Sequence, residues 1–142
     1  MRGYFGIGAE RISKAMNLGT LVRTAHAFGA AFAFVIDATY AVRAAKSDTS
    51  EAAGRLPIYE VPDAGALVLP KKCRLIGIEL TDDAIDLPSF RHPPQAAYVL
   101  GPERGALSAE MQARCDQVVR IPTRFCVNLG VAGAIVMYDR ML

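Results

Sequence analysis

The chain has 142 residues, of which 52% are hydrophobic and 21% charged, and its formal net charge is only +2. This length predicts a single domain over residues 1–142, and no run approaches the roughly 20 apolar residues that a membrane span needs. The small net charge gives no bulk electrostatic argument for a nucleic-acid partner, and three scattered cysteines with two histidines offer no metal-ligand spacing, so we expect no metal site.

Five short apolar runs bounded by turn residues are predicted as strands, at residues 3–8, 31–37, 73–80, 96–101 and 117–122. Helical patterns alternate with them at residues 17–28, 47–54, 62–68, 108–115 and 129–141, and the proline-rich residues 86–95 are predicted as a loop. Several of the runs are apolar on both faces, which is typical of strands covered by helices on each side. The order therefore predicts an α/β fold with a mostly parallel sheet and helices on both faces.

The N-terminal stretch MRGYFGIGAER contains no apolar segment of signal-peptide length and no small-residue cleavage site, so we expect a cytoplasmic protein. Residues 1–55 carry seven basic and four acidic side chains, and Lys71, Lys72 and Arg74 form a second basic group. On charge alone, these groups are consistent either with a phosphate-binding face or with an ordinary solvated surface.

The predicted helix at 17–28 has clear end signals. Asn17 is a candidate N-cap and Gly29 a candidate C-cap, with an apolar stripe between them. Arg23 falls off that stripe, on the opposite side of the helix from Ala25, so its side chain is expected to point away from the core. From this helix alone, Arg23 is either an ordinary surface arginine or a functional one.

The predicted helix at 129–141 is apolar all round until Asp139 and Arg140, which predicts a buried helix. Gly130 and Gly133 weaken it by roughly 1 kcal/mol each relative to alanine. They indicate either the close approach of another backbone or bound molecule, or simple tight packing.

The stretch VLGPERGALS, residues 99–108, ends an apolar run in a Gly-Pro-Glu-Arg-Gly turn. An ordinary turn would explain the glycines and proline. However, residues 16–30 and 120–140 likewise join the end of an apolar run to a helix or begin a helix. Because ligands in open α/β sheets bind outside the carboxyl ends of the strands, these three segments are expected to converge on one pocket.

In this order, the three segments resemble the three motifs of the SpoU-like (TrmH-type) RNA ribose methyltransferases of the SPOUT superfamily. The matching residues are Asn17, Gly19, Arg23 and Ala25 in the first motif, Leu100, Gly101 and Glu103 in the second, and Ile121, Pro122 and Asn128 in the third. The sequence departs from the usual pattern at Leu18, Thr20 and Ala106, and Cys126 stands where a serine is usual. The likeness spans residues 16–140.

The resemblance implies a C-terminal deep trefoil knot, S-adenosylmethionine bound in the knotted region, and a homodimer. Adenine would be held mainly by main-chain groups, since the glycines of the 101–105 turn let the backbone approach a flat ligand. The cofactor-binding residues implied are Ile78, Glu79, Leu80, Leu100, Gly101, Glu103, Gly105, Ile121, Cys126, Asn128 and Leu129.

The implied reaction is the transfer of a methyl group from a sulfonium to a ribose 2′-hydroxyl, in which the enzyme mainly aligns the two centres and helps to remove a proton. Arg23 is the implied catalytic residue. Because a guanidinium stays protonated, we favour a role in binding the neighbouring phosphate and stabilising the developing alkoxide, while proton acceptance by a phosphate-bound arginine stays open. Asn17 would orient Arg23 or the ribose, Glu103 would orient arginine or loop backbone, and Asn128 would fix the third loop.

The implied RNA is tRNA in preference to rRNA, with the anticodon loop favoured because its bases and 2′-hydroxyls are accessible. The alternative is a catalytically inactive knotted RNA-binding module, to which Cys126 and the short loop before Asn128 point. A dinucleotide oxidoreductase is disfavoured, because no Gly-x-Gly-x-x-Gly follows a strand.

Overall fold

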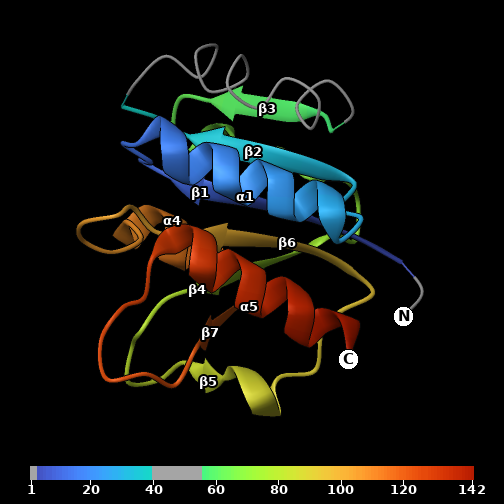
Figure 1. The fold of residues 1–142 in the computed structure, drawn as a ribbon, viewed down its shortest axis with the longest axis vertical. Helices are drawn as coiled ribbons and strands as arrows, with labels where there is room; N and C mark the ends of the chain where they lie inside the picture. The colour runs from blue at the N-terminus through green and yellow to red at the C-terminus, as the bar shows by residue number, and fades with distance from the viewer. Residues whose placement is uncertain (1–2, 40–55) are drawn as a thin grey trace.

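The structure is a computed structural model that describes residues 3–39 and 56–142. Within these ranges, seven strands form one sheet in the order β3-β2-β1-β6-β4-β7-β5, and every pairing between neighbours is parallel (Figure 1). The strands are β1 (Tyr4–Glu10), β2 (Phe32–Ile36), β3 (Ile58–Val61), β4 (Arg74–Ile78), β5 (Ile85–Asp86), β6 (Gln95–Leu100) and β7 (Gln117–Arg120). The carboxyl ends of parallel strands lie at one edge, so their loops gather there.

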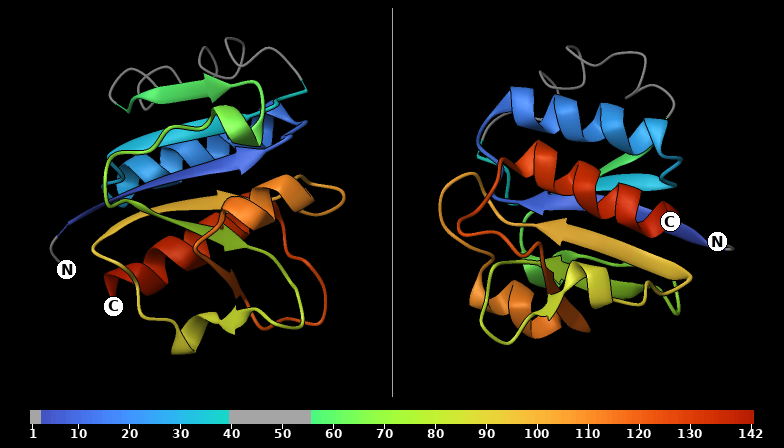
Figure 2. Two further views of the ribbon diagram at one scale, coloured as in Figure 1. Left: turned by 180° about the vertical axis from the view of Figure 1, so that it is seen from behind. Right: turned by 60° about the horizontal axis from the view of Figure 1, so that its bottom comes forward.

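Helices cover both faces of the sheet. The long helices α1 (Ala15–Ala27) and α5 (Leu129–Met141) lie side by side on one face, and α4 (Ala109–Arg114) lies with the 3₁₀ turn η1 (Ala64–Ala66) on the other (Figures 1 and 2). A second 3₁₀ turn, η2 (Leu87–Ser89), follows β5. Each face buries its own apolar cluster, so the two-sided apolar character of the strands is explained by two packed layers.

The five predicted strands are confirmed, with shifts of a few residues at their ends. Two further strands, β3 and β5, were not predicted, because neither forms a clear apolar run in the sequence. Strand β3 lies at one edge of the sheet, and β5, at the other edge, has only two residues. The predicted helix at 62–68 is wrong, since only the 3₁₀ turn η1 forms there. Residues 86–95 are not purely a loop, because they contain η2. The helix predicted at 47–54 lies outside the described residues.

Helix α1 begins earlier than the sequence predicts. Its N-cap is Lys14, so the prediction of an Asn17 cap is wrong: Asn17 lies within the first turn, is buried, and makes tertiary contacts instead. The prediction that Gly29 marks the end of this helix is confirmed. Gly29 has φ +82°, and the N–H groups of Gly29 and Ala30 donate to the carbonyls of His26 and Ala25, which is a Schellman motif with glycine at the left-handed position.

Helix α5 is not buried all round, contrary to the sequence prediction. Val131, Ile135 and Tyr138 are 50%, 37% and 59% exposed and lie along one side of the helix at the spacing of an apolar stripe. The opposite side packs closely on α1, where a Cβ at Gly133 would lie 2.6 Å from Cδ1 of Leu21. The helix therefore has one face in the core and one apolar face open to solvent in the single chain.

Arg140 is buried near the end of α5, although the sequence reads it as the return of a polar surface. Its guanidinium donates to the carbonyls of Pro93, Pro94 and Tyr4 and to the hydroxyl of Tyr98. These bonds satisfy a buried charge and tie the end of α5 to the start of β6.

Candidate active site

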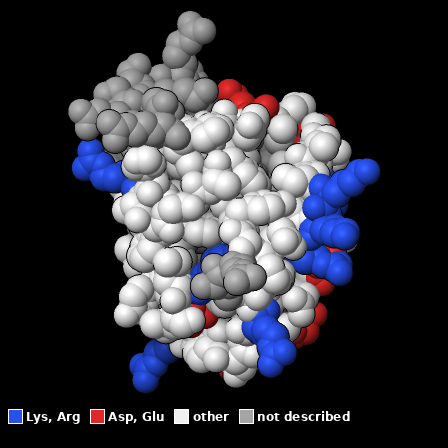
Figure 3. Space-filling model, turned by 90° about the vertical axis from the view of Figure 1, so that its right-hand side faces the viewer, with Lys and Arg blue, Asp and Glu red and all other residues white. Residues whose placement is uncertain are grey.

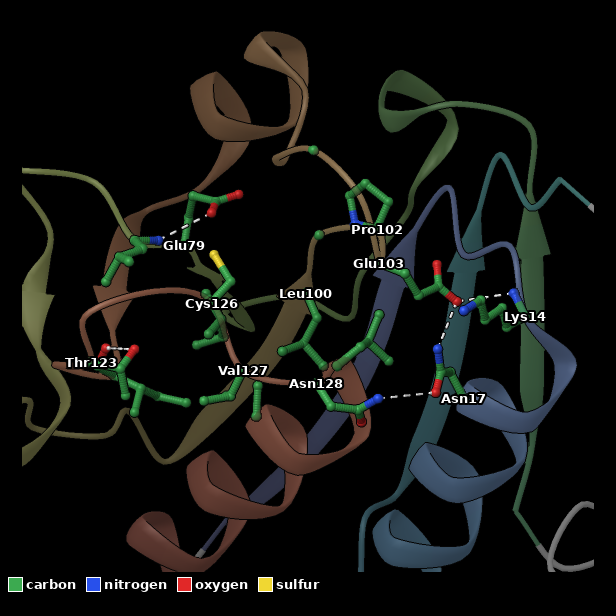
Figure 4. A pocket seen from close by; sticks show the side chains of 17 residues that line it. Lys14, Asn17, Glu79, Leu100, Pro102, Glu103, Thr123, Cys126, Val127 and Asn128 are labelled. Carbon is green, nitrogen blue, oxygen red and sulfur yellow. Dashed lines mark hydrogen bonds between the residues drawn. The ribbon is translucent and has the colours of Figure 1, made fainter.

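A cavity of about 300 Å³ lies at the carboxyl edge of the sheet, bounded by the loops after β4, β6 and β7 and by the start of α1 (Figure 4). Glu79 and Cys126 lie on one side of it, and Lys14, Asn17 and Glu103 on the other. The lining residues are Lys14, Asn17, Ile78, Glu79, Leu80, Leu100, Gly101, Pro102, Glu103, Gly105, Ile121, Thr123, Cys126, Val127, Asn128, Leu129 and Ala132. Segments from opposite ends of the chain thus form one cavity.

All eleven positions predicted to bind a cofactor line this cavity, and so do three of the four predicted catalytic residues, Asn17, Glu103 and Asn128. Arg23 does not line it: its side chain is exposed on α1. The structure therefore brings together the three motif loops but does not bring Arg23 to the cavity of its own chain.

Five of the lining residues are not among the individually predicted site residues, although Pro102 belongs to the predicted 101–105 turn. They are Lys14, Pro102, Thr123, Val127 and Ala132. Each lies within a few residues of a predicted position, so their place in the same loops was the signal that could have identified them.

Glu103 anchors the loop after β6 to the start of α1. Its Oε1 accepts from the N–H and hydroxyl of Ser13 at 2.9 and 3.1 Å, and its Oε2 accepts from the N–H of Lys14 at 2.9 Å and Nδ2 of Asn17 at 3.0 Å. A carboxylate is also favoured at this place by the positive end of the α1 dipole. Glu103 therefore acts as a tertiary cap on α1.

These donors change the acidity of Glu103. Burial by itself would raise the pKa of this carboxyl, but the bonds from Asn17 and from the N–H groups of Ser13 and Lys14 favour the charged form and lower the pKa below its ordinary value of 4.5. Glu103 is therefore an anionic acceptor at neutral pH, suited to orientation of the loop.

Asn128 begins α5 and meets Asn17. Its Oδ1 accepts from the N–H groups of Gly130 and Val131 at 2.8 and 3.2 Å, which is side-chain capping of a helix N-terminus. Its Nδ2 donates to Oδ1 of Asn17 at 3.4 Å. The chain Asn128–Asn17–Glu103 therefore links all three motif segments (Figure 4).

Two further carboxylates hold the loop between β6 and α4. Glu79 accepts from the N–H of Leu107 at 2.6 Å and from the N–H of Leu80 at 3.1 Å, so it joins the loops after β4 and β6. Glu10, which is 3% exposed, accepts from the N–H and hydroxyl of Ser108 at 2.7 and 2.6 Å. Bonds to charged acceptors are among the stronger hydrogen bonds, so the α4 end of the loop that carries Gly101 to Gly105 into the cavity is held firmly.

The three cysteines differ in environment. Cys126 is exposed and lines the cavity. Burial, followed by the charges of Asp116 and Glu10, raises the pKa of Cys115 to about 11. Burial also raises the pKa of Cys73. Cys126 is therefore the thiol that a bound molecule in the cavity would cover.

Within residues 3–39 and 56–142, His, Cys, Asp and Glu side chains form no group of three or more that could hold a metal ion. Over the same part of the chain, no helix has the length and apolar character needed to cross a bilayer.

Comparison with known proteins identifies the family. A family model described as the SpoU rRNA methylase family matches residues 5–138. The mouse tRNA (guanosine(18)-2′-O)-methyltransferase TARBP1 is 31% identical over 141 residues, which cover 92% of this chain and 9% of that protein. The chain thus spans about a tenth of this curated relative.

Two solved structures share the fold. The SpoU methyltransferase AviRb from Streptomyces viridochromogenes in complex with the cofactor AdoMet has a TM-score of 0.83 at 23% identity, covering 99% of this chain and 57% of that one. A structure described as giving insights into the 2-OH methylation of C/U34 on tRNA has a TM-score of 0.83 at 20% identity, covering 99% of this chain and 91% of that one.

Proposed function

The chain belongs to the SpoU rRNA methylase family, whose model matches residues 5–138, and on this basis we propose that it transfers a methyl group from S-adenosylmethionine to a ribose 2′-hydroxyl of RNA. The observation that carries the proposal is the convergence of the three motif loops on one cavity, with Asn17, Glu103 and Asn128 hydrogen-bonded in series. The mouse relative named for 2′-O-methylation supports the reaction type.

The lining of the cavity fits S-adenosylmethionine. Apolar side chains of the three loops, among them Leu100 and Ile121, offer walls for a flat purine, and main-chain groups of the 101–105 turn lie beside them. Among the lining residues, the carboxylates of Glu79 and Glu103 outnumber the ammonium of Lys14, which favours a cationic sulfonium. When bound, this cofactor supplies an activated methyl group.

The residues of the chain have two tasks in this reaction. The 2′-oxygen would form the new bond to the methyl carbon and release its proton to water, while the bound cofactor would supply the methyl group and take up the electron pair of the broken S–C bond. Asn17, Glu103 and Asn128 hold the three loops in register, so that the reacting centres are aligned. Arg23 binds the phosphate next to the ribose and stabilises the developing alkoxide.

The active form is a homodimer in which Arg23 of one copy contributes to the active site at the cavity of the other copy. Two observations support this. Arg23 is exposed and does not line the cavity of its own chain, and the adjacent helix α5 exposes the apolar stripe of Val131, Ile135 and Tyr138. A second copy packed on α1 and α5 would cover that stripe.

The RNA is tRNA, with the anticodon loop as the favoured region. The named substrate of the mouse relative is tRNA. The present chain also covers 91% of the solved structure whose description concerns C/U34 on tRNA, so the two chains are similar in length. Single-stranded loops also present their 2′-hydroxyls and bases to a protein more openly than helices do.

The family's C-terminal trefoil knot is part of the proposal. Its support is the sheet order β6-β4-β7-β5, which places the loops after β4, β6 and β7 around one cavity from which α5 begins. A crystal structure in which residues 121–142 do not pass through a loop of the chain would remove the knot.

The test is methyl transfer by the purified chain. Radiolabelled S-adenosylmethionine is incubated with total tRNA or rRNA, and the RNA is digested to nucleosides, of which a 2′-O-methylated one should carry the label. Label on a base would refute ribose methylation. Binding of RNA without binding of S-adenosylmethionine in calorimetry would instead favour an inactive RNA-binding module.

A further inference from the structure

A second hollow, of about 350 Å³, lies beside the cavity and shares Lys14, Pro102 and Glu103 with it. Three cations, Arg11, Lys14 and Arg104, contribute to its lining together with the hydroxyl residues Ser13 and Thr39. The two hollows are therefore neighbours that share a wall, and they differ in charge.

The charge of the second hollow is positive. Its single lining carboxylate, Glu103, already accepts from Ser13, Lys14 and Asn17. In the part of the chain that the structure describes, neither Lys14 nor Arg104 forms an ion pair with an acidic side chain. Three cationic side chains facing a hollow that a single carboxylate lines indicate an anionic ligand.

Arg11 is held in place for such a ligand. Its backbone has φ +55°, which is uncommon for a residue with a side chain, and its N–H donates to the carbonyl of Ile36 at 2.7 Å. Its Nη2 donates to the carbonyl of Ala106 at 2.8 Å. Its Nε is buried and, among the described residues, has no hydrogen-bond partner. Arg11 is therefore fixed at the hollow by its backbone and by Nη2, while its Nε is closed off from solvent.

The second group of exposed basic residues in the sequence does not line this hollow. Lys71, Lys72 and Arg74 precede or begin β4, whose carboxyl end reaches the cavity, so they lie at the opposite end of the sheet. Arg74 also pairs with Asp116 at 3.6 Å. At that end of the molecule, basic side chains project from the edges of a largely uncharged face (Figure 3).

We propose that the hollow lined by Arg11, Lys14 and Arg104 binds a backbone phosphate of the RNA strand on the other side of the methylated ribose from the phosphate assigned to Arg23. The inference rests on the proposed function, because a strand whose ribose enters the cavity must continue across its rim, and the shared wall of Pro102 and Glu103 is part of that rim. Phosphate contacts of this kind position a strand without selecting its sequence.

The test compares Arg104→Gln with Arg91→Gln. Both residues are exposed, and Arg91 does not line either hollow, so the control makes the same change in net charge away from the site. Affinity for a fluorescein-labelled anticodon stem-loop RNA is measured by anisotropy over a range of salt concentrations, and affinity for S-adenosylmethionine by calorimetry. Thermal unfolding verifies that each variant is folded.

Arg104→Gln should raise the RNA dissociation constant about fivefold and reduce the salt slope by about one, with unchanged cofactor affinity, whereas Arg91→Gln should change neither by more than about twofold. Lys14→Gln should also weaken RNA binding, which gives a second variant if Arg104→Gln unfolds. Equal effects of the two arginine variants would overturn the inference, as would a loss confined to cofactor affinity.

These binding measurements, combined with the methyl-transfer assay above, separate the two proposals. If the wild-type chain methylates RNA and the two arginine variants bind it equally, the phosphate site alone is wrong. If the hollow variants bind RNA less tightly than the wild type does, but the wild type transfers no methyl group, the proposed reaction alone is wrong. A wild-type chain that binds no RNA would refute both.

Discussion

Nδ2 of Asn17 donates a hydrogen bond to Oε2 of Glu103 at 3.0 Å, although 86 positions separate the two residues. The bond joins the first turn of α1 to the loop after β6. Asn17 is itself joined through its Oδ1 to Asn128 at the start of α5. The pair therefore forms the centre of a polar connection between the three loops that line the cavity.

The unfolding free energy of the Glu103→Gln variant should depend less on pH in the acidic range than that of the wild type. The lowered pKa of Glu103 means that its stabilising effect is fully present above 4.5 and is lost as the pH falls through the folded-state pKa. The wild type should therefore exceed the variant in unfolding free energy at pH 7, and the gap should narrow when the pH is lowered well below 4.5. Urea unfolding at pH 7 and in this acidic range measures it, with exposed Glu60→Gln as the control. A gap that is constant with pH would contradict this role.

Cys126 should be the cysteine that a bound cofactor protects. It is exposed in the cavity, whereas the raised pKa of Cys115, about 11, leaves that thiol protonated at pH 8. Iodoacetamide at pH 8 should label Cys126 first, and S-adenosylhomocysteine should slow this labelling several-fold, as followed by peptide mass spectrometry. Cys126→Ser should remove the fast phase. Labelling of Cys126 at the same rate with saturating ligand would place the ligand elsewhere.

Arg23→Ala should reduce the rate of methyl transfer about 100-fold or more while cofactor affinity stays within a few fold. The reason is that Arg23 is exposed on α1 and does not line the cavity, so its proposed task concerns the phosphate and alkoxide. Arg23→Lys should recover only part of the rate, because a lysine lacks the planar two-donor geometry. Single-turnover kinetics and calorimetry separate the two effects, and unchanged turnover in Arg23→Ala would remove this residue from the mechanism.

Ile135→Asp should convert a dimer to a monomer without unfolding the chain. Ile135 is 37% exposed in the middle of the apolar stripe on α5, so an aspartate there meets water in the monomer but would be buried by a second copy. Sedimentation velocity measures the change, and Tyr59→Ser on the edge strand β3 is the control. If Ile135→Asp is monomeric but keeps full methyl transfer, Arg23 does not act across the dimer.

Ser108→Ala should destabilise the protein by about 1–3 kcal/mol. The Ser108 hydroxyl caps α4 by accepting from the N–H of Met111 at 3.1 Å and donates to the buried carboxylate of Glu10 at 2.6 Å. The variant therefore loses a cap and removes a donor from a buried acceptor. Chemical denaturation measures the loss, which should be absent in Ser89→Ala, an exposed position at the end of η2. Equal stabilities of both variants would refute the coupling to Glu10.

Much of the fold could be predicted because its signals are local. Apolar runs with turn residues at their ends located five strands, and Gly29 marked the end of α1 through interactions within a few positions. The edge strands β3 and β5 could not be found in this way, since short edge strands bury few side chains and leave little apolar pattern.

The sequence by itself determined which loops would line a cavity, because parallel strands place their carboxyl ends at one edge and the three motifs follow such ends. Only the tertiary structure decided that Asn17 bonds to Glu103 rather than capping its own helix, that Arg23 lies outside the cavity of its own chain, and that α5 keeps an apolar face open. The physical reason is distance along the chain. Periodicity and capping describe neighbours within a few residues, whereas these three facts depend on which distant segments the packed sheet brings against α1 and α5.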